Sequence, residues 1–133
     1  MEKETGLCEK STLLVADDDP AVLAFLTDFL APHYHLITAS GGDEALQHSK
    51  ATKGTIDLLL TDFEMPGMTG IELATQITAL RPDIKVLLMS GFKGGMLVLN
   101  EGWHYLPKPF IAGTLMTLIN GLIAPAKSKF TAV

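Results

Sequence analysis

The sequence contains one arginine, one cysteine and no long apolar run, and each shortage excludes a class of protein. With 10 basic against 15 acidic side chains, the net charge is −5 at pH 7, and the basic residues are scattered along the chain. Binding of nucleic acid, which needs a concentrated basic face for phosphate contacts, is therefore not expected. Cys8 has no partner for a disulfide within the chain, so we expect a reducing, cytoplasmic setting.

No segment approaches the roughly 20 consecutive apolar residues that span a bilayer. The acidic start Met1–Glu4 does not resemble a signal peptide, so no association with a membrane is expected. A length of 133 residues with 47% hydrophobic and 19% charged residues fits one globular domain with its own core. We predict a domain over residues 11–124, with a flexible N-terminal arm at 1–10 and a C-terminal tail at 125–133.

Short apolar segments alternate with amphipathic ones along the chain. Asp19 is expected to cap a helix that begins at Pro20, and Pro82 to end a later one at Arg81. The alternation predicts an α/β fold, a doubly wound five-stranded parallel sheet with helices on both faces. Strands are expected at residues 12–16, 34–39, 56–60, 84–89 and 103–106, and helices at 20–31, 42–52, 71–81 and 110–123, with a brief irregular helix within 92–101.

Polar side chains follow four of the five expected strands. Asp17 and Asp18 follow the first strand, Asp62 the third, Ser90 the fourth and Lys108 the fifth. Because the carboxyl ends of parallel strands meet at one edge of a sheet, we expect these side chains to lie close together. Clustered carboxylates repel one another, and a hard divalent cation such as Mg²⁺ relieves the repulsion. With a hydroxyl and a lysine added, the set supplies what phosphoryl transfer to a carboxylate requires.

Each of these residues has a simpler explanation when it is taken alone. Asp62 and Ser90 could cap the helices that follow them, and Lys108 could be a solvated surface side chain. Only their combination at matching strand ends favours a site. His33 and His35 lack a carboxylate companion, so they are not expected to bind a metal.

Four motifs at the strand ends resemble those of the response-regulator receiver domains of two-component systems. The resemblance covers about residues 12–123 and implies a flavodoxin-like strand order of 2-1-3-4-5. The motifs are Asp17–Pro20, Asp62–Gly70, Met89–Phe92 and Tyr105–Phe110.

The resemblance implies a role for each carboxylate. Asp62 would accept a phosphoryl group from a phosphohistidine on a sensor histidine kinase or a histidine phosphotransfer protein. Mg²⁺ would be bound by Asp18, Asp62 and the main-chain carbonyl of Glu64, with Asp17 reaching it through water. The chain would then catalyse its own phosphorylation and dephosphorylation and would not act as a conventional enzyme.

The resemblance also implies how the phosphoryl group is held and sensed. Ser90 and Lys108 would bind its oxygens, and a cis peptide before Pro109 would direct Lys108 toward the site. Tyr105 would turn inward as the Ser90 hydroxyl moves, which switches a partner-binding face formed by the helices expected over 92–101 and 110–123. Glu64 and Phe92 would tune how water reaches the phosphoryl group.

The sequence departs from the family in two places near that face. The segment between Ser90 and Lys108 is shorter than in most receivers, which resembles receivers linked to hybrid sensor histidine kinases more than those of DNA-binding regulators. No charged residue occurs from Phe110 to Ala126, so this helix is expected to meet a partner or another domain rather than to form a salt-bridged dimer.

Two other functions share many of these features. A pseudo-receiver would keep the same residues but serve as a docking module without phosphorylation. A Mg²⁺-dependent phosphatase on a similar fold would need a second aspartate two residues after the nucleophile, where Glu64 stands.

Overall fold

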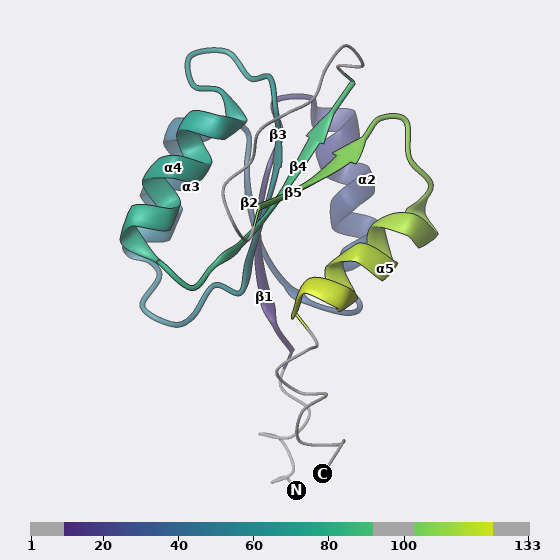
Figure 1. The fold of residues 1–133 in the computed structure, drawn as a ribbon, viewed down its shortest axis with the longest axis horizontal. Helices are drawn as coiled ribbons and strands as arrows, with labels where there is room; N and C mark the ends of the chain where they lie inside the picture. The colour runs from purple at the N-terminus through teal and green to yellow at the C-terminus, as the bar shows by residue number, and fades with distance from the viewer. Residues whose placement is uncertain (1–9, 92–102, 124–133) are drawn as a thin grey trace, which may run out of the picture.

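The computed structural model describes residues 10–91 and 103–123. Five parallel strands form one twisted sheet in the order β2-β1-β3-β4-β5, with helices packed on both faces (Figure 1). The strands are β1 (Thr12–Ala16), β2 (His35–Ala39), β3 (Leu58–Asp62), β4 (Lys85–Ser90) and β5 (Trp103–Pro107). The predicted doubly wound α/β fold and its strand order are confirmed.

The helices cover the sheet in pairs, so each face of the sheet has its own core (Figure 1). Successive strand residues point to opposite faces. Leu59 of β3 packs under α3 and α4, while its neighbour Leu60 packs under α2 and α5. Such two-sided burial explains the nearly continuous apolar strands of the sequence. The helices are α2 (Pro20–Leu30), α3 (Gly42–Ala51), α4 (Gly70–Leu80) and α5 (Ala112–Ile123).

Local sequence fixes where two of these helices begin. The Asp19 carboxylate accepts a hydrogen bond from the Ala21 N–H at 2.9 Å, with Pro20 in the first position of α2, as predicted. Thr69 and Glu72 form a capping box at the start of α4 through hydrogen bonds of 2.9 and 3.1 Å. Both helices thereby begin directly after loops that leave the carboxyl ends of β1 and β3.

Some boundaries differ from the prediction. The third strand begins at Leu58 rather than Ile56, because the Asp57 carboxylate accepts a hydrogen bond from the Thr12 N–H at 2.9 Å and ties the entry of β3 to β1. The last helix begins at Ala112, after the turn at Pro109. The helix expected within 92–101, residues 1–9 of the expected arm and the whole expected tail at 125–133 lie outside the described residues.

Helix α5 carries no charge, but its apolar side chains are not left uncovered. Leu115 and Ile119 are fully buried in the core shared with α2, and Leu118 and Leu122 pack against it. The exposed residues of α5 are small or polar: Gly113, Thr114, Thr117, Asn120 and Gly121. The exposed face of α5 is therefore uncharged rather than apolar.

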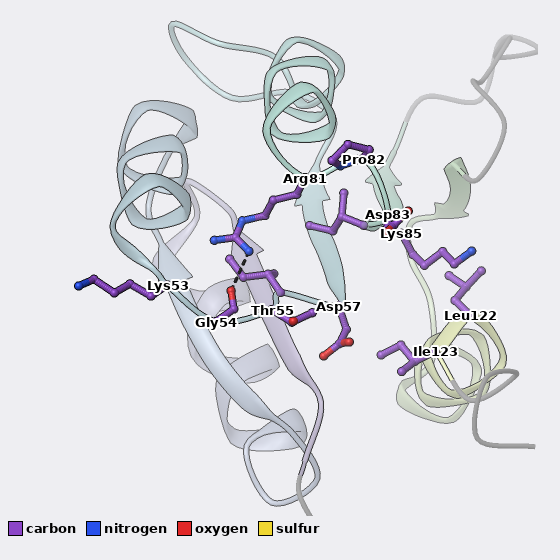
Figure 2. Close-up of a pocket in the computed structure, with 12 residues that line it drawn as sticks. Lys53, Gly54, Thr55, Asp57, Arg81, Pro82, Asp83, Lys85, Leu122 and Ile123 are labelled. Carbon is purple, nitrogen blue, oxygen red and sulfur yellow. Dashed lines mark hydrogen bonds between the residues drawn. The ribbon is translucent and has the colours of Figure 1, made fainter. Parts of the chain in front are cut away.

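The only arginine of the sequence lies at the amino end of the sheet, far along the strands from their carboxyl ends. Its guanidinium donates hydrogen bonds to the main-chain oxygens of Ser49, Thr52 and Gly54 at 2.9, 2.6 and 2.8 Å. Figure 2 shows Arg81 reaching toward Gly54 at one side of an open pocket of about 470 Å³. Arg81 thus joins the end of α4 to the last turn of α3 and to the loop that follows it, and its bond to Ser49 satisfies a carbonyl that the helix C-terminus leaves unpaired.

Candidate functional site

Three carboxylates meet where β1 and β3 end. Asp17 and Asp18 follow β1 directly, and Asp62 is the last residue of β3. One oxygen from each of the three lies within 4.8 Å of the others. Asp17 is fully buried, Asp62 is partly buried and Asp18 is exposed, so the cluster opens to solvent on one side.

The Lys108 ammonium lies among these carboxylates. Its Nζ donates a hydrogen bond to Asp62 Oδ1 at 3.2 Å and lies 3.8 Å from Asp17 Oδ2. The Lys108 N–H also donates to the main-chain oxygen of Ser90 at 2.7 Å, which ties the end of β5 to the end of β4. The peptide between Lys108 and Pro109 is cis, as the family resemblance implied.

Burial and neighbouring charges perturb the pKa of the Asp17 carboxyl. Its burial raises the pKa of the carboxyl above its usual value, and the charges of Asp62 and Asp18 raise it further. The hydrogen bond from the Asp19 N–H and the charge of Lys108 act in the opposite direction. That N–H binds Oδ1 at 2.9 Å, whereas Oδ2 is buried and accepts no hydrogen bond from the described residues.

This donor set fits a hard divalent cation. All three side chains offer carboxylate oxygens, which are the ligands that Mg²⁺ prefers. The buried Oδ2 of Asp17 gives a further reason, because it accepts no hydrogen bond from the described residues and has only the Lys108 ammonium, 3.8 Å away, among them as an ion-pair partner. Glu64, the predicted main-chain ligand, lies two residues beyond Asp62 in the loop before α4, with its own side chain exposed.

The two residues predicted to form the switch lie on neighbouring strands. Ser90 ends β4 and is 2% exposed. Tyr105 is half-buried on β5, where its hydroxyl donates to the Ser90 main-chain oxygen at 3.5 Å. Ser90 and Tyr105 therefore belong to one connected region beside Asp62. Phe92, which was predicted with Glu64 to tune the access of water, lies outside the described residues.

Two features under the site were not singled out from the sequence. Gly70 packs so tightly beneath β3 that a side-chain Cβ there would collide with the Asp62 carbonyl oxygen. Thr61, fully buried, donates a hydrogen bond from its hydroxyl to that same oxygen at 3.0 Å. A polar residue within the apolar run 58–61 was the signal for Thr61, and Gly70 already stood within a recognised motif.

An apolar hollow of about 680 Å³ adjoins the cluster on the side of Lys108 and was not predicted either. Phe25 on α2 lies at its margin and is 46% exposed. The lining comes from the start of α2 and the segment after β5: Ala21, Val22, Phe25, Gly91, Lys108, Pro109 and Phe110.

Residues 13–120 match the family described as the response regulator receiver domain. The chain belongs to this family. The likeness inferred from the four strand-end motifs is thereby confirmed over most of the sequence.

Similar receivers occur in proteins of different kinds. The sequence is 34% identical over 113 residues to the DNA-binding transcriptional regulator NtrC of Azospirillum brasilense, covering 82% of this chain and 23% of that protein. It is 29% identical over 128 residues to the sensor kinase CckA of Brucella abortus, covering 92% of this chain and 14% of that protein. The chain is thus similar to a receiver of a sensor kinase, as the sequence indicated, and also to the receiver of a DNA-binding regulator.

Solved structures agree with the fold. The crystal structure of the receiver domain of the hybrid histidine kinase CckA superposes with a TM-score of 0.76 at 30% identity, covering 85% of this chain and 99% of that one. The response regulator TrrA of Thermotoga maritima, solved in complex with Mg²⁺-BeF, gives a TM-score of 0.73 at 30% identity, with 84% and 98% covered. Among the described residues, no helix is long and apolar enough to cross a membrane.

Proposed function

We propose that this receiver domain takes a phosphoryl group from a phosphohistidine onto Asp62. The observation that carries the proposal is the position of the Asp62 carboxylate, which lies at the end of the central strand between the Lys108 ammonium at 3.2 Å and two further carboxylates. The donor is a sensor histidine kinase or a histidine phosphotransfer protein, since receivers pair with such proteins. We assign the whole function to one domain over residues 11–124.

In the proposed reaction, an oxygen of the Asp62 carboxylate attacks the phosphorus of the phosphohistidine. A phosphorus–oxygen bond forms as the phosphorus–nitrogen bond breaks, and the bonding electron pair stays on the imidazole nitrogen of the donor. Lys108, whose ammonium pairs with the Asp62 carboxylate before the reaction, holds a phosphoryl oxygen in the product. The Ser90 hydroxyl, at the end of the adjacent strand, donates to another.

Asp17, Asp18, Asp62 and the Glu64 main-chain carbonyl are the groups that would hold Mg²⁺. When bound, the ion supplies positive charge that offsets repulsion between the carboxylates and the incoming phosphoryl group. Asp17 contributes from a buried position, where its Oδ2 accepts no hydrogen bond from the described residues and is therefore available to a cation or to a water bound to it. Glu64 and Phe92 tune the access of water that later removes the phosphoryl group.

The apolar hollow beside Lys108 provides a place for the donor to dock. A protein that delivers a phosphohistidine to Asp62 must cover the surface around it, and this hollow adjoins Lys108 directly. The exposed Phe25 ring at its margin offers apolar area to such a partner. A macromolecular donor is therefore recognised by apolar contact next to the charged centre.

Phosphorylation then changes the surface on the side of β4 and β5. The new charge draws the Ser90 hydroxyl toward the phosphoryl oxygens and releases space for the Tyr105 ring to turn inward. The present contact of Tyr105 with the Ser90 main chain supports this coupling. A downstream partner or domain reads the altered face next to α5.

Beryllofluoride, a mimic of the phosphoryl group, tests this proposal without a protein donor. With Mg²⁺ present, we expect ¹⁹F NMR to show slow-exchanging bound fluorides in the parent protein and none in Asp62→Asn. Chemical shifts of Ser90 and Tyr105 should move on binding. A folded parent that binds no beryllofluoride would contradict the proposal and favour a docking module that is not phosphorylated.

A further inference from the structure

Thr61 makes contacts that its place in an apolar strand does not require. It is fully buried on β3, one residue before Asp62. Its hydroxyl donates to the Asp62 main-chain oxygen at 3.0 Å and lies 4.0 Å from the sulfur of Met65. One hydroxyl thereby contacts both the first and the fourth residue of the segment 62–65, which leads out of the sheet.

Other hydrogen bonds hold the same segment from different directions. The Phe63 N–H donates to the main-chain oxygen of Met89 at 2.7 Å, and the Phe63 oxygen accepts from the Gly70 N–H at 2.8 Å. The peptide between Asp62 and Phe63 is therefore fixed at its N–H by β4 and at its oxygen by Thr61. Its orientation decides how the chain continues toward Glu64.

The main-chain oxygen of Asp62 is closely packed against the start of α4. The start of α4 packs so closely that even a methyl group on Gly70 would collide with this oxygen. A buried carbonyl that loses its hydrogen bond is destabilised unless the chain shifts to find another donor. Removal of the Thr61 hydroxyl would therefore favour a displaced turn.

We infer that Thr61 is a positioning residue, which orients the 62–65 turn so that the Asp62 carboxylate and the Glu64 main-chain carbonyl can serve one cation. This inference rests on the proposed function and extends it to a residue that touches neither the cation nor the phosphoryl group. Partners of this kind, which hold ligands in place, typically change metal affinity roughly tenfold or more when they are removed.

A purely structural role predicts something else. Thr is β-branched and suits a strand, so its methyl group alone could account for its presence. In that case Val, which has the same shape, would serve equally well. The two roles are separated by the hydroxyl and by a readout that reports the site rather than the fold.

The test compares Mg²⁺ affinity, followed by NMR titration of backbone amides at a temperature well below unfolding, in the parent and four variants. Thr61→Val removes the hydroxyl and keeps the shape, whereas Thr61→Ser keeps the hydroxyl. Thr61→Ala, paired with Thr61→Ser, differs from it by the hydroxyl alone and replaces Thr61→Val if that variant does not fold. Thr78→Val is the matched control, because Thr78 on α4 has a buried hydroxyl without a hydrogen-bond partner among the described residues.

We expect Mg²⁺ affinity to fall roughly tenfold in Thr61→Val and Thr61→Ala and to stay within about twofold of the parent in Thr61→Ser and Thr78→Val. In the absence of Mg²⁺, amide hydrogen exchange at Phe63 and Gly70 should also be faster in Thr61→Val and Thr61→Ala than in the parent. Equal affinity in Thr61→Val and the parent would overturn the inference, as would equal losses in Thr61→Ser and Thr61→Ala.

Failure of the proposed function gives a different experimental result from failure of the role proposed for Thr61. Parent protein that binds Mg²⁺ and beryllofluoride, with affinity unaffected by Thr61→Val, leaves the function standing and removes only the role of Thr61. Parent protein that binds neither ligand overturns both claims. Whether the parent protein binds Mg²⁺ and beryllofluoride therefore distinguishes the two results.

Discussion

Among single residues, Asp17 is fully buried, and its Oδ2 accepts no hydrogen bond from the described residues. The pKa of its carboxyl is raised above the ordinary value of 3.8, chiefly by burial. The folded protein therefore holds this proton more tightly than the unfolded chain does. The free energy of unfolding consequently falls as pH rises from about 3.8 through the raised pKa.

Replacement of Asp17 by Asn should therefore stabilise the protein at pH 7 in buffer without divalent cations. We expect the melting temperature in calorimetry to rise by several degrees, with little difference from the parent at a pH below both pKa values. Mg²⁺ should stabilise the parent but not the variant. Asp18→Asn, at an exposed position, is the control and should give a smaller gain; a lower melting temperature for Asp17→Asn at pH 7 would contradict this explanation.

Gly70 shows how closely packing and the site are linked. Gly70→Ala places a methyl group against the Asp62 carbonyl oxygen, so we expect a loss of about 1–3 kcal/mol in the free energy of unfolding. Urea denaturation measures this loss. Gly113→Ala on α5 is the matched control, because its new methyl group would meet nothing within 4 Å, and it should be neutral or mildly stabilising. Equal effects of the two substitutions would refute the packing argument.

At the scale of elements, the junction of α3 and α4 depends on one side chain. Arg81→Met removes hydrogen bonds to three carbonyls, in the last turn of α3 and the loop after it, and to the Ser49 hydroxyl, so we expect a loss of about 2–3 kcal/mol in stability. Mg²⁺ affinity should not change, because this junction lies at the opposite edge of the sheet. Lys53→Met, an exposed neighbour at the same pocket, should have little effect. Weakened Mg²⁺ binding in folded Arg81→Met would show that the two edges are coupled.

The apolar hollow predicts a difference between small and large phosphoryl donors. Phe25→Ser on α2 should slow transfer from a phosphorylated histidine kinase or phosphotransfer protein several-fold, because it removes apolar docking area. Phosphorylation by acetyl phosphate should proceed at the parent rate. Leu80→Ser, equally exposed at the end of α4, is the control and should change neither rate. Equal slowing with both donors would point to damage at Asp62 instead of lost docking.

The elements themselves follow from local patterns in the sequence. Apolar runs that stop at Asp17 and Asp62, and a cap at Asp19 before Pro20, locate β1, β3 and α2 to within two residues. The early part of β3 was misplaced because the role of the Asp57 carboxylate depends on β1, which is distant in sequence. Contacts of this kind are made only when the sheet assembles.

The residues of the candidate site could be predicted from the sequence, but the contacts and the hollow around them could not. The rule that parallel strands end at one edge brings Asp17, Asp62 and Lys108 together, and they do lie together. Neither the hydroxyl bond of Thr61 nor the hollow beside Phe25 could be read from spacing, since both require the relative placement of side chains from different segments. The expectation that α5 meets a partner or another domain stays a prediction, and the structure adds that its exposed residues are small or polar.

At the scale of the whole molecule, the two edges of the sheet have separate tasks. The carboxyl edge collects carboxylates, a lysine and an apolar hollow, which together form the proposed phosphoacceptor site. The amino edge holds the hydrogen bonds of Arg81 and of Asp57, which stabilise the fold. Substitutions at the amino edge are therefore expected to change stability without changing the site.

The central claim is that Asp62 accepts a phosphoryl group, and intact mass spectrometry after incubation with acetyl phosphate and Mg²⁺ tests it most directly. We predict the gain of one phosphoryl group by the parent protein, none by Asp62→Ala and none by the parent when EDTA replaces Mg²⁺. A folded parent that gains no mass, or an Asp62→Ala variant that gains the same mass as the parent, would contradict the claim.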